Sequence, residues 1–244
     1  MQKKIIAVGG GEIKEKTTLK IDEYIANLAK KHAGDKRATA LFLGTASHDS
    51  MPYFNSFRKT YTSVFDIKAD VALTVYGEMN FEHIKEKFDK ADMIYVGGGD
   101  TKFMLDKWNE TGVTELVKDA YNRGVIISGL SAGAICWFED MYTDYDIMRN
   151  EEGEYKILKG MGLIKGLCSP HFDNREPDYF EAIKDGNFTS GYGIGNNSAL
   201  EFTDGRLTAV LSSGGKSFTV NNENGNVFKT EITNEDILSG KYDG

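Results

Sequence analysis

The sequence predicts an α/β protein with a mostly parallel sheet, and three observations support this prediction. Short apolar runs, typical of buried strands, alternate with segments of helical periodicity through the first half of the chain. Glycines follow several of these runs, where the backbone must turn sharply or approach a ligand. In the final part of the chain, short apolar runs follow one another closely and are separated by residue pairs typical of turns. This pattern predicts antiparallel strands.

The first half of the chain predicts alternating strands and helices with short connections. The apolar run Lys4–Val8 ends in glycines and predicts a strand that is buried on both faces. Apolar residues at helical spacing predict a helix over 18–33, which ends before Gly34. Further strands are expected over 40–44, 71–76, 93–96 and 125–128, and further helices over 52–64, 80–90, 101–108 and 113–123. This alternation favours right-handed crossovers, with helices covering both faces of the sheet.

The last part of the chain predicts an antiparallel meander on one edge of this sheet. Its short runs are separated by turn signals such as Asp204-Gly205 and Asn224-Gly225. The runs cover 191–195, 199–203, 206–211, 217–220 and 226–232. Since no proline-rich linker interrupts the chain, we expect one domain over residues 1–244, in which about 222–244 could form a C-terminal extension.

Composition excludes several classes of protein. The 244 residues contain 29 Lys and Arg against 37 Asp and Glu, a net charge of −8, whereas nucleic-acid binding requires a basic face. No apolar run is long enough to cross a bilayer, and the apolar stretch near the N-terminus is too short for a signal peptide. The two cysteines cannot form a disulfide framework. We therefore expect a cytoplasmic protein.

The strongest functional signal is the segment 129–133, GLSAG, which follows the predicted strand 125–128. A G-x-S-x-G sequence between a buried strand and a helix, here predicted over 132–138, indicates a nucleophile elbow. Its small residues let the helix pass close to the strand, and the turn exposes the Ser131 hydroxyl. The N–H of Ala132 points to the same place and can stabilise an oxyanion. Ser131 is the candidate nucleophile; the alternative is an ordinary serine in a glycine-rich turn.

A serine nucleophile needs a base, and the chain contains four histidines. His32 and His83 fall on polar faces of predicted helices. His48 follows the second predicted strand and is the weaker candidate. His171 comes after a short apolar run and Pro170, at the end of a predicted strand. We therefore expect His171 to be the base.

The third member of such a triad is a carboxylate that orients the imidazole. The acidic stretch after the elbow helix offers Asp144 and Asp146, and the choice between them stays open. A solvated surface loop would give the same pattern.

A second glycine run, 97–99, ends the strand 93–96 and is followed by Asp100 and Thr101. It lacks the spacing of nucleotide-binding loops, so we expect it to bring a second backbone N–H to the oxyanion site. Asp100 and Thr101 are assigned to substrate binding. The histidine and acidic residues do not have the spacing of a zinc site, and we expect no metal and no cofactor.

These segments together resemble the peptidase E family of serine peptidases, which includes aspartyl dipeptidase and, more distantly, cyanophycinase. The resemblance extends to about residue 215 and rests on four landmarks in order, 96–101, 129–134, 143–144 and 169–172. It implies a three-layer α/β sandwich similar to the class I glutamine amidotransferases, which have cysteine at the elbow. Here Ser131 stands at the elbow and Cys136 lies five residues beyond it, which argues against glutaminase chemistry.

The resemblance also implies functions for individual residues. Ser131 would be the nucleophile and His171 the base, and the N–H groups of Gly99 and Ala132 would form the oxyanion hole.

For the third member, the resemblance gives two positions. An ungapped comparison with aspartyl dipeptidase places the family's aspartate at Asp146, whereas a Thr-Asp-Ser motif of nearer relatives falls on Asp144. Cyanophycinase has a glutamate after its histidine, in a segment similar to 195–199, where this chain has Asn197.

Substrate binding is expected near His171. The arginine pattern that aspartyl dipeptidase has after its histidine is not clearly present, with only Arg175 nearby, so the sequence leaves a preference for an N-terminal aspartate open. The acidic surroundings predict a site for the α-amine of a peptide, with Asp173 and Asp178 as its carboxylates, because a buried ammonium needs such a partner. Asp173 and Arg175 are assigned to this substrate site.

The sequence therefore predicts a dipeptidase-like serine exopeptidase that cleaves short peptides through a Ser-His-Asp acyl-enzyme mechanism. Short peptides are the expected partners, without nucleic acid or membrane, and a homodimer is compatible with the sequence. One alternative is an esterase or amidase of the α/β-hydrolase type, although that fold places its histidine farther from its serine than 40 residues. The other alternative is a non-catalytic relative that binds a small ligand.

Overall fold

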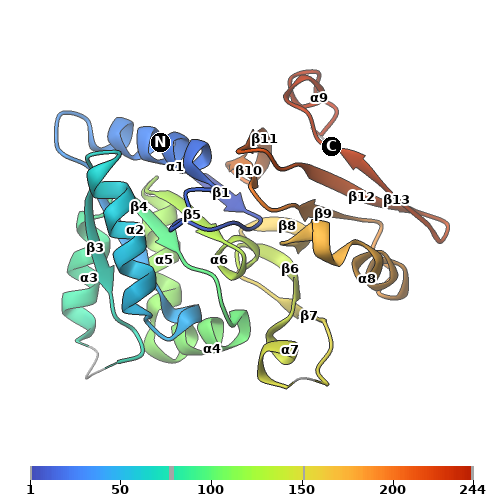
Figure 1. The fold of residues 1–244 in the computed structure, drawn as a ribbon, viewed down its shortest axis with the longest axis horizontal. Coiled ribbons are helices and arrows are strands. Elements are labelled where there is room, and N and C mark those ends of the chain that lie inside the picture. The colour runs from blue at the N-terminus through green and yellow to red at the C-terminus, as the bar shows by residue number, and fades with distance from the viewer. Residues whose placement is uncertain (1, 77–79, 151, 243–244) are drawn as a thin grey trace.

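The computed structural model describes residues 2–76, 80–150 and 152–242, and its centre is a seven-stranded sheet (Figure 1). The strand order is β11-β10-β1-β5-β4-β2-β3, in which the five strands from β1 to β3 are parallel and the two others antiparallel. The strands are β1 (Lys4–Val8), β2 (Thr39–Leu43), β3 (Lys68–Ala72), β4 (Met93–Val96), β5 (Ile126–Leu130), β10 (Ser198–Thr203) and β11 (Arg206–Ser212).

Helices cover both faces of this sheet. On one face, α1 and α2 pack with the strands into an apolar cluster; on the other, α3, α4 and α5 pack into a second. The helices are α1 (Leu19–Ala33), α2 (Met51–Ser63), α3 (Phe81–Lys90), α4 (Thr101–Thr111), α5 (Val113–Asn122), α6 (Ala132–Ile135), α7 (Tyr145–Arg149), α8 (Phe172–Asp185) and α9 (Asn234–Leu238), with a 3₁₀ turn at Thr45–Ser47. None of these helices, within the part of the chain described, is long and apolar enough to cross a membrane.

A second, six-stranded sheet has the order β13-β12-β9-β8-β6-β7. Its strands are β6 (Phe138–Thr143), β7 (Lys156–Lys159), β8 (Ile164–Ser169), β9 (Ser190–Ile194), β12 (Ser217–Glu223) and β13 (Asn226–Glu231). Helix α8 packs against one side of it through Phe172 and Tyr179. Residues from its other side join the large apolar cluster of the first sheet.

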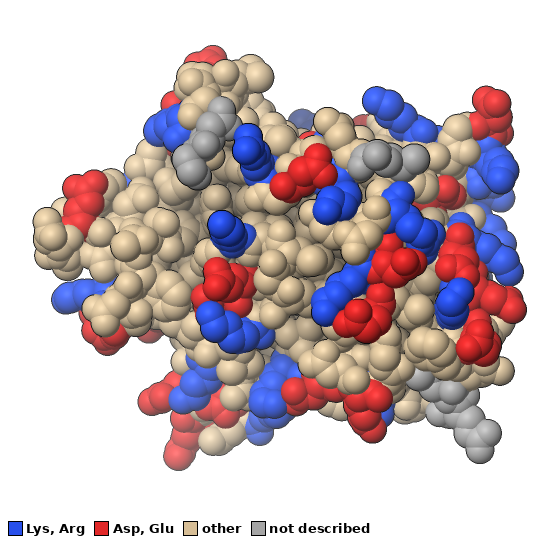
Figure 2. Space-filling view, turned by 180° about the vertical axis from the view of Figure 1, so that it is seen from behind, with Lys and Arg blue, Asp and Glu red and all other residues tan. Residues whose placement is uncertain are grey.

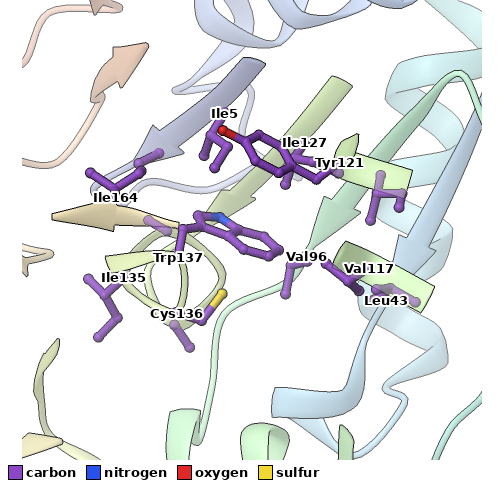
Figure 3. Packing of buried hydrophobic residues seen from close by; sticks show 14 of the residues in the cluster. Ile5, Leu43, Val96, Val117, Tyr121, Ile127, Ile135, Cys136, Trp137 and Ile164 are labelled. Atoms are coloured by element: carbon purple, nitrogen blue, oxygen red, sulfur yellow. The ribbon is translucent and has the colours of Figure 1, made fainter. Parts of the chain in front are cut away.

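Trp137 links the two sheets. Its indole is fully buried in the same cluster as Ile5 and Ile127 of the first sheet and Ile164 of the second (Figure 3). The Trp108 ring lies 6.2 Å away, centroid to centroid. Burying a side chain of this size contributes several kcal/mol to stability, about 3–5 by the usual cost of its removal. This cluster therefore fixes the position of the second sheet, which carries His171 at the end of β8.

The predicted α/β class is confirmed, and most elements of the first half agree with prediction within a few residues. The third strand is an exception, because β3 ends at Ala72 and 73–76 is not a strand. The Asp49 carboxylate accepts hydrogen bonds from the backbone N–H groups of residues 74–76, which removes those groups from the sheet. The predicted helix 132–138 is only one turn long, because β6 begins at Phe138.

The predicted single meander at the C-terminal end is wrong. Strands β10 and β11 do extend the first sheet, but β9, β12 and β13 belong to the second, where β9 runs parallel to β8. In this C-terminal region the chain crosses between the sheets at two turns. Asn197, in the left-handed region with φ 57°, separates β9 from β10, and Gly214, with φ 113°, lies between β11 and β12.

Charged side chains are interspersed on the molecular surface. On the face opposite to that of Figure 1, acidic and basic groups alternate, and the residues drawn there form no continuous basic area (Figure 2).

Candidate active site

Ser131 lies at a sharp turn between β5 and α6. Its φ of 56° and ψ of −108° are strained for a residue other than glycine, which is the backbone geometry of a nucleophile elbow. A side chain at Gly129 would overlap the backbone of Gly133, and one at Gly133 would overlap the backbone of Val96. The two glycines therefore let α6 pass directly over the strands and present Ser131 at their carboxyl ends.

The structure brings the predicted nucleophile and base together. Nε2 of His171 lies 2.8 Å from Oγ of Ser131. His171 connects β8 to α8 in the left-handed region, with φ 48°, and its backbone N–H donates to the Gly9 carbonyl oxygen at 3.0 Å. Because Gly9 follows β1 and Ser131 follows the neighbouring β5, this bond ties the histidine turn to the strands that carry the serine.

The imidazole is oriented by an asparagine. Nδ1 of His171 lies 2.7 Å from Oδ1 of Asn196. Since an amide oxygen only accepts hydrogen bonds, Nδ1 carries the proton in this arrangement and Nε2 accepts from the Ser131 hydroxyl. This is the tautomer that a general base requires.

The predictions for the third member are therefore wrong for this structure. Asp144 does not contact His171, because its Oδ2 pairs with Nη2 of Arg175 at 2.6 Å. Asp146 accepts from the N–H of Glu154 at 3.2 Å. The resemblance to cyanophycinase places its glutamate at Asn197, whereas the side chain that contacts the imidazole is that of the preceding residue, Asn196.

Asn196 is held by contacts that the sequence does not reveal. Its backbone N–H donates to Oδ2 of Asp173 at 2.6 Å, so the predicted substrate ligand Asp173 positions the orienting residue. A side chain at Gly10 would overlap both Asn196 and the His171 imidazole. Glycine at position 10 is thus required for this pair to meet.

The environment lowers the pKa of His171 below its usual 6.5. Burial is the main cause, because it disfavours the charged imidazolium. Arg175 also lowers this pKa, while the hydrogen bond to Asn196 and the charges of Asp144 and Asp173 raise it. His171 is therefore neutral near pH 7, as a proton acceptor must be.

Two backbone N–H groups are available beside Ser131. Ala132 begins α6, so its N–H has no partner within the helix. In the glycine loop, Gly98 donates to the Tyr53 hydroxyl at 3.3 Å and Asp100 donates to Ala46 at 2.8 Å. The N–H of Gly99 between them donates to no group among the described residues.

The glycine loop lies against the nucleophile. A Cβ at Gly98 would be 3.3 Å from that of Ser131, and a Cβ at Gly99 would overlap the Ala46 carbonyl. This arrangement is compatible with Gly99 and Ala132 as oxyanion donors, which stays a prediction.

A pocket of about 440 Å³ opens beside Ser131 and His171. It is bounded by residues 11–14 after β1, by Tyr53 from α2, and by the glycine loop. This volume falls within the range typical of small-ligand sites.

Asp100, Thr101 and Arg175, predicted to bind substrate, do not line this pocket. Asp100 caps α4, accepting from the Phe103 N–H at 2.8 Å and pairing with Arg149 at 2.6 Å. Thr101 is 1% exposed and Arg175 4% exposed, so both side chains are inside the protein.

His48 and the two cysteines do not line the pocket. His48 packs against the Phe103 ring in a tilted arrangement, with centroids 4.2 Å apart. Cys136 and Cys168 are buried, and burial raises the pKa of both thiols, so they remain protonated. Among the described residues, no three His, Cys, Asp or Glu side chains come together as metal ligands.

Comparison with known proteins identifies the family to which this chain is related. The model of peptidase family S51 matches residues 5–210. The chain is 34% identical over 224 residues to the uncharacterized peptidase YgaJ of Bacillus subtilis (strain 168), covering 89% of this chain and 92% of that protein. It is 28% identical over 128 residues to peptidase E of Streptomyces coelicolor, covering 52% and 51% of the two chains.

Two solved structures share the fold. A peptidase from an acI-B1 Actinobacterium has a TM-score of 0.65 at 19% identity, covering 94% of this chain and 93% of the other. A peptidase E protein from Listeria monocytogenes EGD-e has a TM-score of 0.58 at 16% identity, covering 96% and 100%. The fold and the sequence matches thus define a hydrolase of the peptidase class. The chain belongs to peptidase family S51.

Proposed function

We propose that this peptidase is a serine exopeptidase that cleaves short peptides, with Ser131 as nucleophile and His171 as general base. The observation that carries the proposal is the 2.8 Å contact between Ser131 Oγ and His171 Nε2 at a strained strand-to-helix turn. A hydroxyl in contact with a neutral imidazole is the arrangement that activates serine.

The reaction would proceed through an acyl-enzyme. Ser131 Oγ attacks the scissile carbonyl carbon while its proton passes to His171 Nε2, a transfer worth about 10²–10⁴-fold in rate. The C–N bond then breaks, and His171 returns this proton to the leaving amine. Water attacks the ester by the same route, which releases the acid and restores Ser131.

Asn196 would act as a neutral orienting residue. Cys-His-Asn arrangements in papain-like proteases show that an amide can replace the carboxylate of a triad. A neutral amide fixes the tautomer but contributes little charge to stabilise the imidazolium. In this protein, the carboxylates of Asp144 and Asp173 lie close enough to raise the His171 pKa and so favour that cation.

The N–H groups of Gly99 and Ala132 would hold the oxyanion, each donor being worth about 3 kcal/mol. Their availability beside Ser131 supports this assignment. The Gly98 N–H is already bound to Tyr53, so Tyr53 would position the loop that presents Gly99.

A library of dipeptides and tripeptides, with products identified by mass spectrometry, tests this proposal. Wild type should release N-terminal residues or dipeptides, and Ser131→Ala should lose this activity by at least about 10³-fold. Equal cleavage by both proteins would exclude Ser131 as the nucleophile. If only esters in a parallel panel are hydrolysed, the enzyme is a serine esterase instead of a peptidase.

A further inference from the structure

Glu12 contributes a carboxylate to the border of the pocket at Ser131. Among the described residues that line this pocket, Glu12 carries the only carboxylate and Lys14 the only ammonium. The Glu12 carboxylate forms no ion pair within 4 Å in the described part of the chain, unlike surface carboxylates such as Asp66 and Asp89. A charge of this kind is available to a ligand.

The turn that carries Glu12 is fixed relative to the catalytic pair. The N–H of Glu12 donates to Oγ1 of Thr17 at 2.9 Å, and its carbonyl accepts from the Thr17 N–H at 3.2 Å. Two residues earlier, the Gly10 carbonyl accepts from the N–H of Asn197 at 2.9 Å. Because Asn197 follows Asn196, this last contact ties the turn to the segment whose Asn196 side chain contacts the His171 imidazole.

Glu12 and Asp173 add negative charge near this pocket. Burial is the main cause that raises the pKa of Tyr53, and the charge of Glu12 raises it further, so the field of this carboxylate reaches the pocket wall. On the side of His171, Asp173 adds negative charge, whereas the Asp144 carboxylate is paired with the buried cation Arg175. The one ammonium on the described lining, that of Lys14, carries the opposite charge.

We infer that Glu12 binds the α-ammonium group of the peptide substrate and so selects peptides with a free N-terminus. This inference rests on the proposed function. In an exopeptidase that releases the first residue, the α-nitrogen is two bonds from the carbonyl carbon that Ser131 attacks, so it enters the same pocket. Asp173, predicted from the sequence to bind this group, is instead engaged with the Asn196 N–H.

The test compares Glu12→Gln with the control variant Glu15→Gln. Glu15 is an exposed carboxylate of the same turn, but it does not line the pocket. The substrates are the best dipeptide of the library and the p-nitrophenyl ester of N-acetylalanine, which has no ammonium group. Glu12→Gln should raise KM for the dipeptide about 10-fold, as expected for a partly exposed charged hydrogen bond. Its kcat/KM for the ester should stay within about two-fold, and Glu15→Gln should leave both substrates unchanged.

Three results would overturn the inference. An unchanged dipeptide KM in Glu12→Gln, with Ser131-dependent cleavage intact, would reject it and leave the proposed function standing. A rise in KM with Lys14→Met but not with Glu12→Gln would show that a substrate carboxylate is recognised instead. Absence of any Ser131-dependent cleavage of peptide or ester would reject the proposed function, and this inference with it.

Discussion

Oδ1 of Asn196 lies 2.7 Å from Nδ1 of His171, so the imidazole beside Ser131 is oriented by a neutral amide. The two carboxylates expected at this place are used elsewhere, Asp144 with Arg175 and Asp146 with the backbone of Glu154. The amide that orients the imidazole is thus separate from the carboxylates near it: Asp144 and Asp173 raise the pKa of His171, while Arg175, which is paired with Asp144, lowers it.

Substitutions at Asn196 should show this separation. Asn196→Ala removes the acceptor that fixes the imidazole, and we expect kcat to fall about 10²-fold while the midpoint of thermal unfolding changes little. Asn196→Asp keeps an acceptor and adds a negative charge, so it should retain activity and raise the pKa of His171. Full pH–rate profiles of both variants measure these effects. Wild-type kcat in Asn196→Ala would show that another group orients the imidazole.

The pH dependence of the wild-type enzyme follows from the lowered pKa of His171. Burial disfavours the imidazolium, so the base stays neutral to below pH 6.5. Activity should therefore be full near pH 7, and the acid limb of kcat/KM should have its midpoint below 6.5. If the midpoint measured on the best dipeptide is at pH 7 or above, the protein stabilises the His171 imidazolium, and the lowered pKa is contradicted.

Asp144 and Asp146 should differ in their effect on stability. Asp144→Asn leaves the guanidinium of Arg175, which is 4% exposed, without a charged partner, and we expect a loss of about 2 kcal/mol in the free energy of unfolding. Asp146→Asn is the control and should change unfolding by less than about 0.5 kcal/mol and kcat by less than about two-fold. Urea unfolding and dipeptide kinetics measure both quantities. A large loss of kcat in Asp146→Asn would restore it as a catalytic candidate.

The buried carboxyl of Asp22 should make the stability of the fold depend on pH. Burial raises the pKa of this carboxyl from 3.8 to about 6, although hydrogen bonds from Thr18 and Tyr61 lower it. A raised pKa in the folded acid means that stability is lost as pH rises from about 4 to about 6, by about 3 kcal/mol. Asp22→Asn should therefore raise the unfolding free energy at pH 7 but not at pH 4. A stabilisation that is equal at both pH values would contradict this account.

The sequence was sufficient to predict Ser131 and His171 as partners because strand periodicity locates both residues. Ser131 follows a buried apolar strand within G-x-S-x-G, and His171 follows another strand, so both were expected at the carboxyl edge of a sheet. The structure places them 2.8 Å apart. The signal for Asn196 was weaker, because a pair of asparagines between two strands is also typical of an ordinary turn.

The division into two sheets could not be predicted from local patterns. Only residues 195–197 separate β9 from β10, and the chain passes from one sheet to the other at this turn, which includes Asn197. The end of β3 depends on Asp49, more than twenty residues away in sequence, which binds the N–H groups of 74–76. Likewise, Asp144 is removed from His171 by Arg175. Each of these outcomes depends on a tertiary contact that periodicity does not encode.

The most direct measurement of the central claim is the site of covalent labelling by a small fluorophosphonate. Ser131 activated by His171 should form one phosphonyl adduct, located on Ser131 by tandem mass spectrometry of the digested protein. His171→Ala should lower the labelling rate by at least about 10²-fold, and a short peptide substrate should compete with the probe. An adduct on a different residue, or labelling of Ser131 at the same rate in His171→Ala, would contradict the proposed nucleophile and base.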